Sequence, residues 1–355
     1  MRLAVGMVAD DLTGALDAAA PFALRGLRTL VVPSLEHLPA APPAGVEVLC
    51  VNTASREIPA AEAARRAGAA AAWLMRLAPR VVFKKVDSRL KGHLPAEAAA
   101  VLAATGRSRA LVAPAIPDLG RRVEDGCLVG LGVPEPVSVA AACAGLPAET
   151  PDTRSDADLD VLAARLLAEG DALVAVGARG LAAALARTWP ARPAPVPPLP
   201  LARPALIAIG SRDPITRGQV AHYRTQARPG ELCHLPAPNG AVPAGSAAPV
   251  TLVTAEPGPA DEPPAAVAAR FAEGLSGHVR SHPPASLLIS GGETAFALLT
   301  RLGVDVIEVG GEALPGVPFA HASIAGRAVL LLTKSGGFGG PETISILAGV
   351  PADVD

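Results

Sequence analysis

The chain has 355 residues, of which 50% are hydrophobic and 18% charged, a composition typical of a globular protein long enough for two domains. Its formal net charge of −2 and its 3% of aromatic residues argue against a nucleic-acid-binding protein, which usually carries a basic surface and stacking rings. The mean hydropathy is high, +0.37. Arginines nevertheless interrupt the longest apolar segment, residues 63–80, so no membrane-spanning helix is expected.

The N-terminal segment and the cysteines predict a cytoplasmic protein. Residues 1–14 combine a strand-length apolar run with two aspartates, and they lack the small-residue cleavage site of a signal peptide. The widely spaced cysteines are interpreted as reduced thiols rather than as zinc ligands or disulfides; they are Cys50, Cys127, Cys143 and Cys233. His278 and His282 have a metal-like spacing but run into two prolines, so they are interpreted as a turn or a helix end, and no metal site is predicted.

Short apolar strands alternate with alanine-rich helices along the chain. This pattern predicts an α/β fold of two domains, each a largely parallel sheet flanked by helices. In the first half, strands are expected at residues 3–9, 29–34, 46–53, 80–86, 109–115 and 172–177, and helices at residues 60–78 and 95–104. Because ligands bind at the carboxyl ends of parallel strands, the residues after each strand are the functional candidates.

Polar residues follow the first and third of these strands. Asp10 and Asp11 leave the first strand in opposite directions, so one carboxylate is expected to meet a ligand and the other to cap the helix that begins near Thr13. Residues 52–56 follow the third strand. The simplest interpretation, as an alternative to a functional role, is a capped turn into the helix at residues 60–78 with Arg56 as a surface charge.

The densest charged cluster, residues 84–93 (KKVDSRLKGH), follows the fourth strand. Such a run is usually a solvated surface, but this one mixes signs and leaves a strand that is expected to be buried. Its arginine and lysines suit a carboxylate substrate, and Asp87 can accept a hydroxyl proton or hold a substrate hydroxyl. A rigid loop after the fifth strand is expected to carry Arg121 at its tip.

Seven prolines between Trp189 and Pro204 predict an extended linker. We therefore expect a first domain at residues 1–190, a linker at residues 191–204 and a second domain at residues 205–355. In the second domain, strands are expected at residues 205–210, 250–255, 286–291, 304–310 and 327–333, with loops in the region 235–264.

Three strands of the second half end in polar loops, SRDPIT at residues 211–216, GGET at 291–294 and KSGGFGG at 334–340. A glycine turn that enters a helix exposes backbone N–H groups and binds anions, most often phosphate. Thr216 can cap its helix, and each loop alone is also explained as a tight turn. Three such loops at one sheet edge favour a nucleotide-binding site. The candidate nucleotide-binding residues are Ser211, Gly291, Gly292, Glu293, Thr294, Lys334, Ser335, Gly336 and Gly337.

Two known nucleotide fingerprints are missing. The chain has no G-x-x-x-x-G-K-[ST] and no G-x-G-x-x-G after its first strand, which disfavours a P-loop protein and a Rossmann dehydrogenase.

Taken together, the polar residues of the first domain suit a small polyhydroxy acid, and the glycine loops of the second domain suit phosphates. Phosphoryl transfer from ATP, with Mg²⁺ implied by the chemistry, connects the two, with the active site expected in the interdomain cleft.

Six motifs resemble, in this order, those of the four-carbon acid sugar kinase family: ADDLTGALDAAAPFALRG, NTASREIPAAEA, FKKVDSRLKGHLPAE, GSRDPITRGQ, ISGGETAFALL and KSGGFGGPE. The resemblance implies an N-terminal substrate domain, a C-terminal nucleotide domain, and ATP-dependent phosphorylation of an acid such as threonate, erythronate or a 3-oxo-tetronate at a terminal hydroxyl. It implies substrate contacts by Asp10, Arg56, Asp87, Ser88, Arg89 and Lys91, to which Asp11 is added as a neighbour. It implies ATP contacts by Ser211, residues 291–294 and Gly337.

Several questions stay open at this point. Arg89 stands where family members commonly have threonine, and the segment after Pro117 is shorter than theirs, so the acid is not identified. Either Asp10 or Asp87 can be the catalytic carboxylate. A sugar-acid sensor without catalysis, and a dehydrogenase or lyase of similar acids, are the alternatives. Whether the protein is a homodimer is also open.

Overall fold

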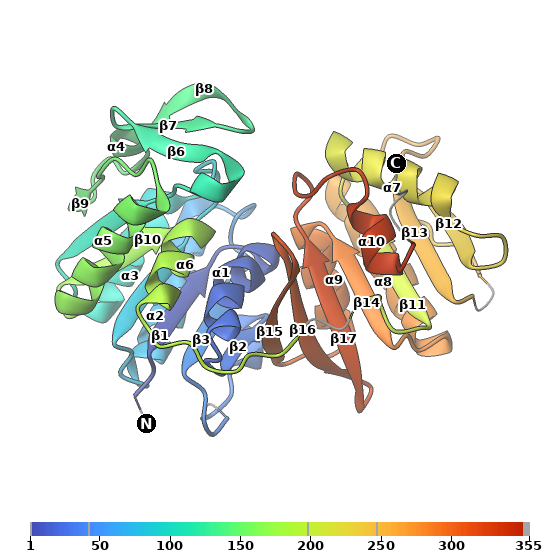
Figure 1. The fold of residues 1–355 in the computed structure, drawn as a ribbon, viewed down its shortest axis with the longest axis horizontal. Coiled ribbons are helices and arrows are strands. Elements are labelled where there is room, and N and C mark those ends of the chain that lie inside the picture. Colours follow the sequence, from blue (N-terminus) through green and yellow to red (C-terminus); the bar gives the residue numbers. More distant parts are fainter. Residues whose placement is uncertain (1, 42, 197–198, 246–247, 351–355) are drawn as a thin grey trace. The chain divides into compact units, whose positions relative to one another are not determined.

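The computed structural model describes residues 2–41, 43–196, 199–245 and 248–350. The chain divides into two compact units, Met1–Pro195 and Val196–Asp355. The described part of each unit has a largely parallel sheet flanked by helices (Figure 1), which confirms the predicted fold class. No helix among these residues has the length and apolar character needed to cross a bilayer.

The main sheet of the first unit is parallel throughout, because the connections between its neighbouring strands are crossovers that return the chain to the same end of the sheet. Its strands, in spatial order, are β2 (Thr29–Val32), β3 (Val48–Asn52), β1 (Val5–Ala9), β4 (Val81–Lys85), β10 (Leu173–Gly177), β5 (Arg109–Ala113) and β9 (Ala148–Glu149). All but the last were predicted. Every residue of β1 and β3 is buried, as expected for strands covered on both faces.

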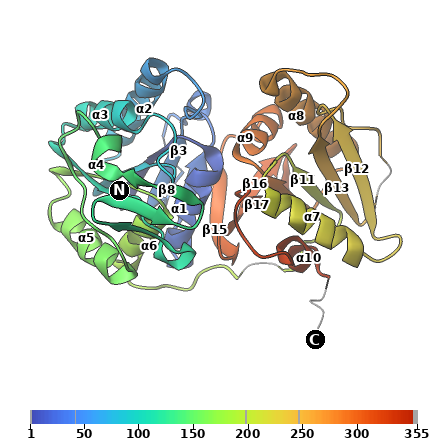
Figure 2. The ribbon, with the colours of Figure 1, turned by 90° about the horizontal axis from the view of Figure 1, so that it is seen from above.

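Helices cover both faces of this sheet, and Figure 2 shows them on opposite sides. They are α1 (Leu12–Leu24), α2 (Ala60–Met75), α3 (Leu94–Thr105), α4 (Val139–Ala142), α5 (Asp156–Ala168) and α6 (Arg179–Arg187), with short 3₁₀ turns η1 (Leu35–His37) and η2 (Pro117–Leu119). α2 packs against α3, and α6 packs against both α1 and α5. Asp11 caps α1 by accepting a hydrogen bond from the backbone N of Gly14 at 2.6 Å, which confirms the predicted capping role for one of the two aspartates.

A small antiparallel sheet follows β5 and was not predicted. It consists of β6 (Arg121–Glu124), β7 (Cys127–Gly130) and β8 (Val133–Ser138). The expectation that Arg121 lies at a loop tip is wrong, because its backbone pairs with that of Ile116 and turns the chain back into β6. Its side chain is consequently buried, not exposed.

The sheet of the second unit is parallel over five strands and ends in an antiparallel meander. The strands, in spatial order, are β12 (Leu232–Pro238), β13 (Val250–Glu256), β11 (Ala205–Ile209), β14 (Ser286–Ser290), β17 (Arg327–Lys334), β16 (Val317–Ile324) and β15 (Ile307–Leu314). The helices are α7 (Pro214–Gln226), α8 (Pro264–Ser281), α9 (Gly292–Arg301) and α10 (Thr343–Ala348). α8 packs against α9, and α7 against α10.

Two expectations for the second unit are wrong. The region 235–264 is not all loop, because β12 continues to Pro238 and prolines are tolerated in an edge strand, where a missing N–H breaks no ladder. Thr216 does not cap α7. Asp213 does so by accepting a hydrogen bond from Ile215 N at 2.9 Å.

Candidate active site

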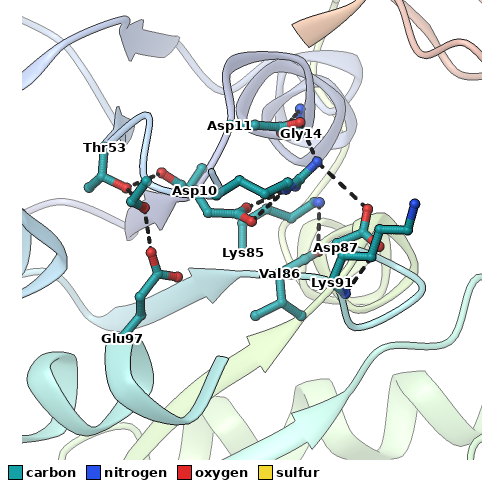
Figure 3. Close-up of polar contacts among 12 residues, drawn as sticks. Asp10, Asp11, Gly14, Thr53, Lys85, Val86, Asp87, Lys91 and Glu97 are labelled. Carbon is teal, nitrogen blue, oxygen red and sulfur yellow. Dashed lines mark hydrogen bonds and ion pairs between the residues drawn. The ribbon is translucent and has the colours of Figure 1, made fainter. Parts of the chain in front are cut away.

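The first unit gathers charged residues where β1, β3 and β4 end. Ala9 of β1 lies in register with Asn52 of β3 and with Lys85 of β4, so the three strands finish side by side. Asp10, directly after β1, is buried in the centre of the cluster (Figure 3). The predicted substrate residues that follow these three strands therefore come together at one sheet edge.

Arg56 is held by three carboxylates. Its Nε and Nη2 donate to Asp10 Oδ2 and Oδ1 at 2.8 and 3.0 Å, a bidentate pair, and its Nη1 donates to Asp11 Oδ2 at 2.6 Å. Asp87 Oδ2 lies 3.7 Å from the same Nη1. The interpretation of Arg56 as a surface charge is therefore wrong, because these carboxylates draw the guanidinium into the sheet edge.

A buried polar chain lies near Asp10 and was not predicted. Lys84 Nζ pairs with Glu97 Oε2 at 2.9 Å, and both side chains are almost completely excluded from solvent, at 0% and 2% exposure. The other Glu97 oxygen accepts from Ser55 Oγ, which lies 2.6 Å from Thr53 Oγ1 (Figure 3). The sequence does hold a signal for this pair, since a lysine in an otherwise apolar, buried strand needs a buried acidic partner.

These charges set the ionisation of Asp10. Burial opposes its negative charge, but Lys84, Arg56 and Lys85 together outweigh burial and hold the pKa of Asp10 below its ordinary value. Asp10 is thus ionised at neutral pH, and both of its oxygens accept hydrogen bonds from Arg56. Such a carboxylate suits positioning better than proton transfer.

Asp87 organises the loop after β4. Its Oδ1 accepts hydrogen bonds from the backbone N of Arg89 at 2.9 Å and of Lys91 at 3.4 Å. Its Oδ2 accepts no hydrogen bond from any residue in the described part of the chain and lies 3.7 Å from Arg56 Nη1. In the same loop, Ser88 Oγ accepts from Arg121 Nη1 at 2.7 Å.

The three predicted loops of the second unit also meet at one sheet edge. Ile209 of β11 lies in register with Ser290 of β14, which in turn lies in register with Lys334 of β17. The loops are packed so closely that a Cβ on Gly336 would lie 2.8 Å from Asp213 Cβ and would also clash with Ser211 Oγ. Gly336 is therefore required for the close approach of the first and third loops.

The second loop leads into the ten-residue helix α9. Gly291 is its N-cap residue, and the backbone N–H groups of Gly292, Glu293 and Thr294 in the first turn have no acceptor within the helix. Thr294 also packs against Gly210 at the end of β11, at a distance that leaves no room for a Cβ on that glycine. This edge thus presents backbone donors that the helix itself leaves without an acceptor, together with the positive end of a helix dipole.

Lys334 is buried and holds its own loop in place. Its Nζ donates to Thr216 Oγ1 at 3.0 Å and to the backbone O atoms of Ser335, Gly336 and Phe338 at 3.0, 3.3 and 3.0 Å. Burial lowers the pKa of Lys334 to about 8. The ammonium is thus directed into the loop, where it fixes the backbone, instead of being displayed on its surface.

A cavity of about 290 Å³ opens beside Ser211 at the ends of β11 and β13. Its walls combine apolar and polar side chains, from Ile209, Ser211, Arg217, Val220, Thr254, Ala255, Glu256 and Pro257. The polar members of this cavity other than Ser211 were not predicted, because Thr254 and Glu256 lie within β13 and Arg217 lies on α7, away from the loops that the sequence singled out. Its size fits part of a small ligand rather than a whole nucleotide.

Comparisons with known proteins match both units. Residues 5–146 match a sugar-binding N-terminal domain family, and residues 244–344 match a nucleotide-binding C-terminal domain family. The D-threonate kinase of Bordetella bronchiseptica is 31% identical over 96% of this chain and 95% of its own length. The chain belongs to the four-carbon acid sugar kinase family. It is an ATP-dependent sugar-acid kinase.

Other relatives agree with this assignment. The 3-oxo-tetronate kinase of Cupriavidus necator is 29% identical to this kinase over 96% of the chain and 95% of its own length, and the D-threonate kinase of the same organism is 30% identical over 94% of each. Solved structures from Salmonella typhimurium LT2 and Haemophilus influenzae share its fold, with TM-scores of 0.69 and 0.68 at 21% identity. They cover 95% and 97% of this kinase, and 97% and 99% of their own chains.

Proposed function

We propose that this kinase transfers the γ-phosphoryl group of ATP to a terminal hydroxyl of a four-carbon sugar acid, such as D-threonate or a 3-oxo-tetronate. The first unit would bind the acid and the second would bind ATP. Relatives named for both acids support the substrate class. The observation that carries the proposal is the cluster of Asp10, Arg56 and Asp87, in which one carboxylate oxygen is left open beside two fixed charges.

Asp87 is the better candidate for the catalytic base. Its Oδ2 is available to accept the proton of a substrate hydroxyl, whereas both oxygens of Asp10 already accept hydrogen bonds from Arg56. Asp10 and Arg56 would then hold Asp87 and the substrate in place. Phosphoryl transfer depends mainly on positioning and charge stabilisation, so this support matters as much as the base.

The loops of the second unit would bind the nucleotide. The N-terminal turn of α9 and the loop held by Lys334 offer backbone N–H groups for the phosphates, with Ser211 between them. The cavity beside Ser211 would take the base or the ribose. In this arrangement Lys334 shapes the phosphate loop and contributes its charge from behind it.

The described residues do not provide a protein cage for Mg²⁺. They contain no group of three or more histidine, cysteine, aspartate or glutamate side chains able to hold a metal ion. Asp10 and Asp11 are paired with Arg56, which already supplies positive charge there. Mg²⁺ would instead arrive with ATP, bound by phosphates and water.

A coupled ADP-release assay on a panel of four-carbon acids tests the proposal, together with thermal shifts for ATP and NAD. We expect ADP release with at least one of the acids and stabilisation by ATP but not by NAD. Stabilisation by an acid without ADP release would contradict the proposal and indicate a sensor. Stabilisation by NAD would favour a dehydrogenase.

A further inference from the structure

Arg121 is a buried arginine without an acidic partner. Only 6% of the residue is exposed, and its Nε and Nη1 donate to two uncharged acceptors, the backbone O of Leu131 at 2.6 Å and Ser88 Oγ at 2.7 Å. Its Nη2 has no hydrogen bond among the residues that the structure describes. A buried guanidinium normally has a carboxylate partner, because burying an unpaired charge is costly.

A second guanidinium lies beside it. Arg89 is exposed, and its side chain forms no ion pair or hydrogen bond with the described residues. Both arginines approach Gly132, in the turn between β7 and β8: a Cβ there would lie 3.3 Å from Arg121 Nη2 and 3.9 Å from Arg89 Nη1. Burial and the nearby charge of Arg89 lower the pKa of Arg121 by more than the charges of Asp87 and Asp17 raise it. Two guanidinium groups thus lie close together, and neither forms an ion pair with a carboxylate of the described residues.

Other arginines at this sheet edge are compensated. Arg56 pairs with Asp10 and Asp11, and Arg179, after β10, pairs with Asp118 at 2.5 Å. The group formed by Arg121 and Arg89 differs from them in lacking a carboxylate. The pair is also close to Asp87 along the chain. Arg89 lies two residues after Asp87, and Arg121 donates to Ser88, the residue that directly follows Asp87.

We propose that Arg121 and Arg89 bind the carboxylate of the sugar acid, and that the sheet β6–β8 is the element that selects acids over neutral sugars. This inference rests on the proposed function and assigns one end of its substrate. With the carboxylate at Arg121 and Arg89, the hydroxyl end of a short acid points toward Asp87. Arg56 is then not the carboxylate ligand, because its N–H groups already serve protein carboxylates.

The test compares four single variants in steady-state kinetics with D-threonate, or with whichever panel acid the wild type prefers. Arg121→Gln and Arg89→Gln each remove one charge of the pair. Arg122→Gln is the matched control, because Arg122 is the next residue of β6, is exposed, and pairs with Glu124 at 2.7 Å. Arg121→Lys keeps the charge and loses the fork geometry.

We expect Arg121→Gln and Arg89→Gln to raise the KM for the acid by about 10- to 100-fold, the size typical of a lost charge-assisted hydrogen bond. The KM for ATP should stay unchanged, as should both constants in Arg122→Gln. Arg121→Lys should recover part of the loss. Arg89→Gln keeps the inference testable if Arg121→Gln fails to fold, because the exposed Arg89 side chain makes no hydrogen bond or ion pair with the described residues that the substitution would remove.

The inference is overturned if both glutamine variants keep the wild-type KM for the acid, or if they lower kcat while KM stays constant. An equal rise in the KM for ATP would also overturn it, because that would indicate a general disturbance of the fold. If the wild type itself phosphorylates none of the acids, the proposed function fails first, and this inference fails with it. The two failures are therefore distinguishable.

Discussion

The two units have the same kind of sheet edge but build it from different parts of the chain. At the edge of the first unit, side chains carry the chemistry: Asp10, Arg56 and Asp87 form a cluster of opposite charges. At the edge of the second unit, the backbone carries it, through glycine loops, the first turn of α9 and the buried ammonium of Lys334. In both units, the residues that follow the parallel strands lie together at the carboxyl edge of the sheet.

This difference predicts which kind of substitution should impair each site. A site made of paired charges loses function when one side chain is shortened, because its partner is then left uncompensated. A site made of bare backbone loses function when a side chain is added. Substitutions in the two units should accordingly affect different kinetic constants.

The largest effect is expected at Asp87. Asp87→Asn keeps an oxygen to accept from the backbone N of Arg89 and Lys91, but it cannot accept the substrate proton. We expect kcat to fall by about 10²- to 10⁴-fold, with the Kd of ADP, measured by calorimetry, unchanged. Asp125→Asn, at an exposed position of the same unit, is the control. Loss of ADP binding in Asp87→Asn would contradict the proposal that the first unit binds the acid and the second unit binds the nucleotide.

A smaller effect, in the other unit, is expected from Gly336→Ala. The added Cβ meets Asp213 and Ser211, so the third loop has to shift, at a cost of about 1–3 kcal/mol. We expect the Kd of ADP to rise by about tenfold and the KM of the acid to stay constant. Gly218→Ala adds a Cβ in open space on α7 and should change neither constant. Equal effects of the two variants would argue against tight loop packing.

The smallest effect concerns pH. Because burial lowers the pKa of Lys334 to about 8, its ammonium is charged below that pH and becomes a neutral amine above it. The neutral amine has only two N–H groups for the acceptors that the ammonium now serves. We expect ADP affinity to fall by about fivefold as the pH rises from about 7 to about 9.5. Lys334→Met should bind ADP more weakly at neutral pH, and its ADP affinity should not fall further as the pH rises. If the affinity of this variant still falls with rising pH, the effect does not come from Lys334.

The apolar runs were enough to predict the parallel core. Strands such as β1 and β14 are continuous buried runs between helices, and the residues that follow them are recognisable from the sequence alone. That one of Asp10 and Asp11 caps α1 also followed from their position, although the sequence did not decide which one. These features depend on local sequence and on the rule that parallel strands end at one edge.

Features that depend on long-range contacts were missed. The strands β6–β8 are short and largely exposed, so they lack a hydrophobic period. Glu97 lies in an alanine-rich helix, and nothing near it in the sequence shows that Lys84 lies opposite. Arg121 and Ser88 are 33 positions apart, and only the turn of β6 brings them together. Such contacts arise from the folded chain rather than from any segment of it.

The buried pair of Lys84 and Glu97 also constrains how this protein can change over generations. Removing either partner alone leaves a buried, uncompensated charge, at a cost of about 3–5 kcal/mol, which is a large part of the stability of an ordinary domain. Replacing both with apolar residues of similar volume can be nearly neutral. A lineage that lost the pair would therefore have to cross an unstable intermediate, so the two positions should be inherited together.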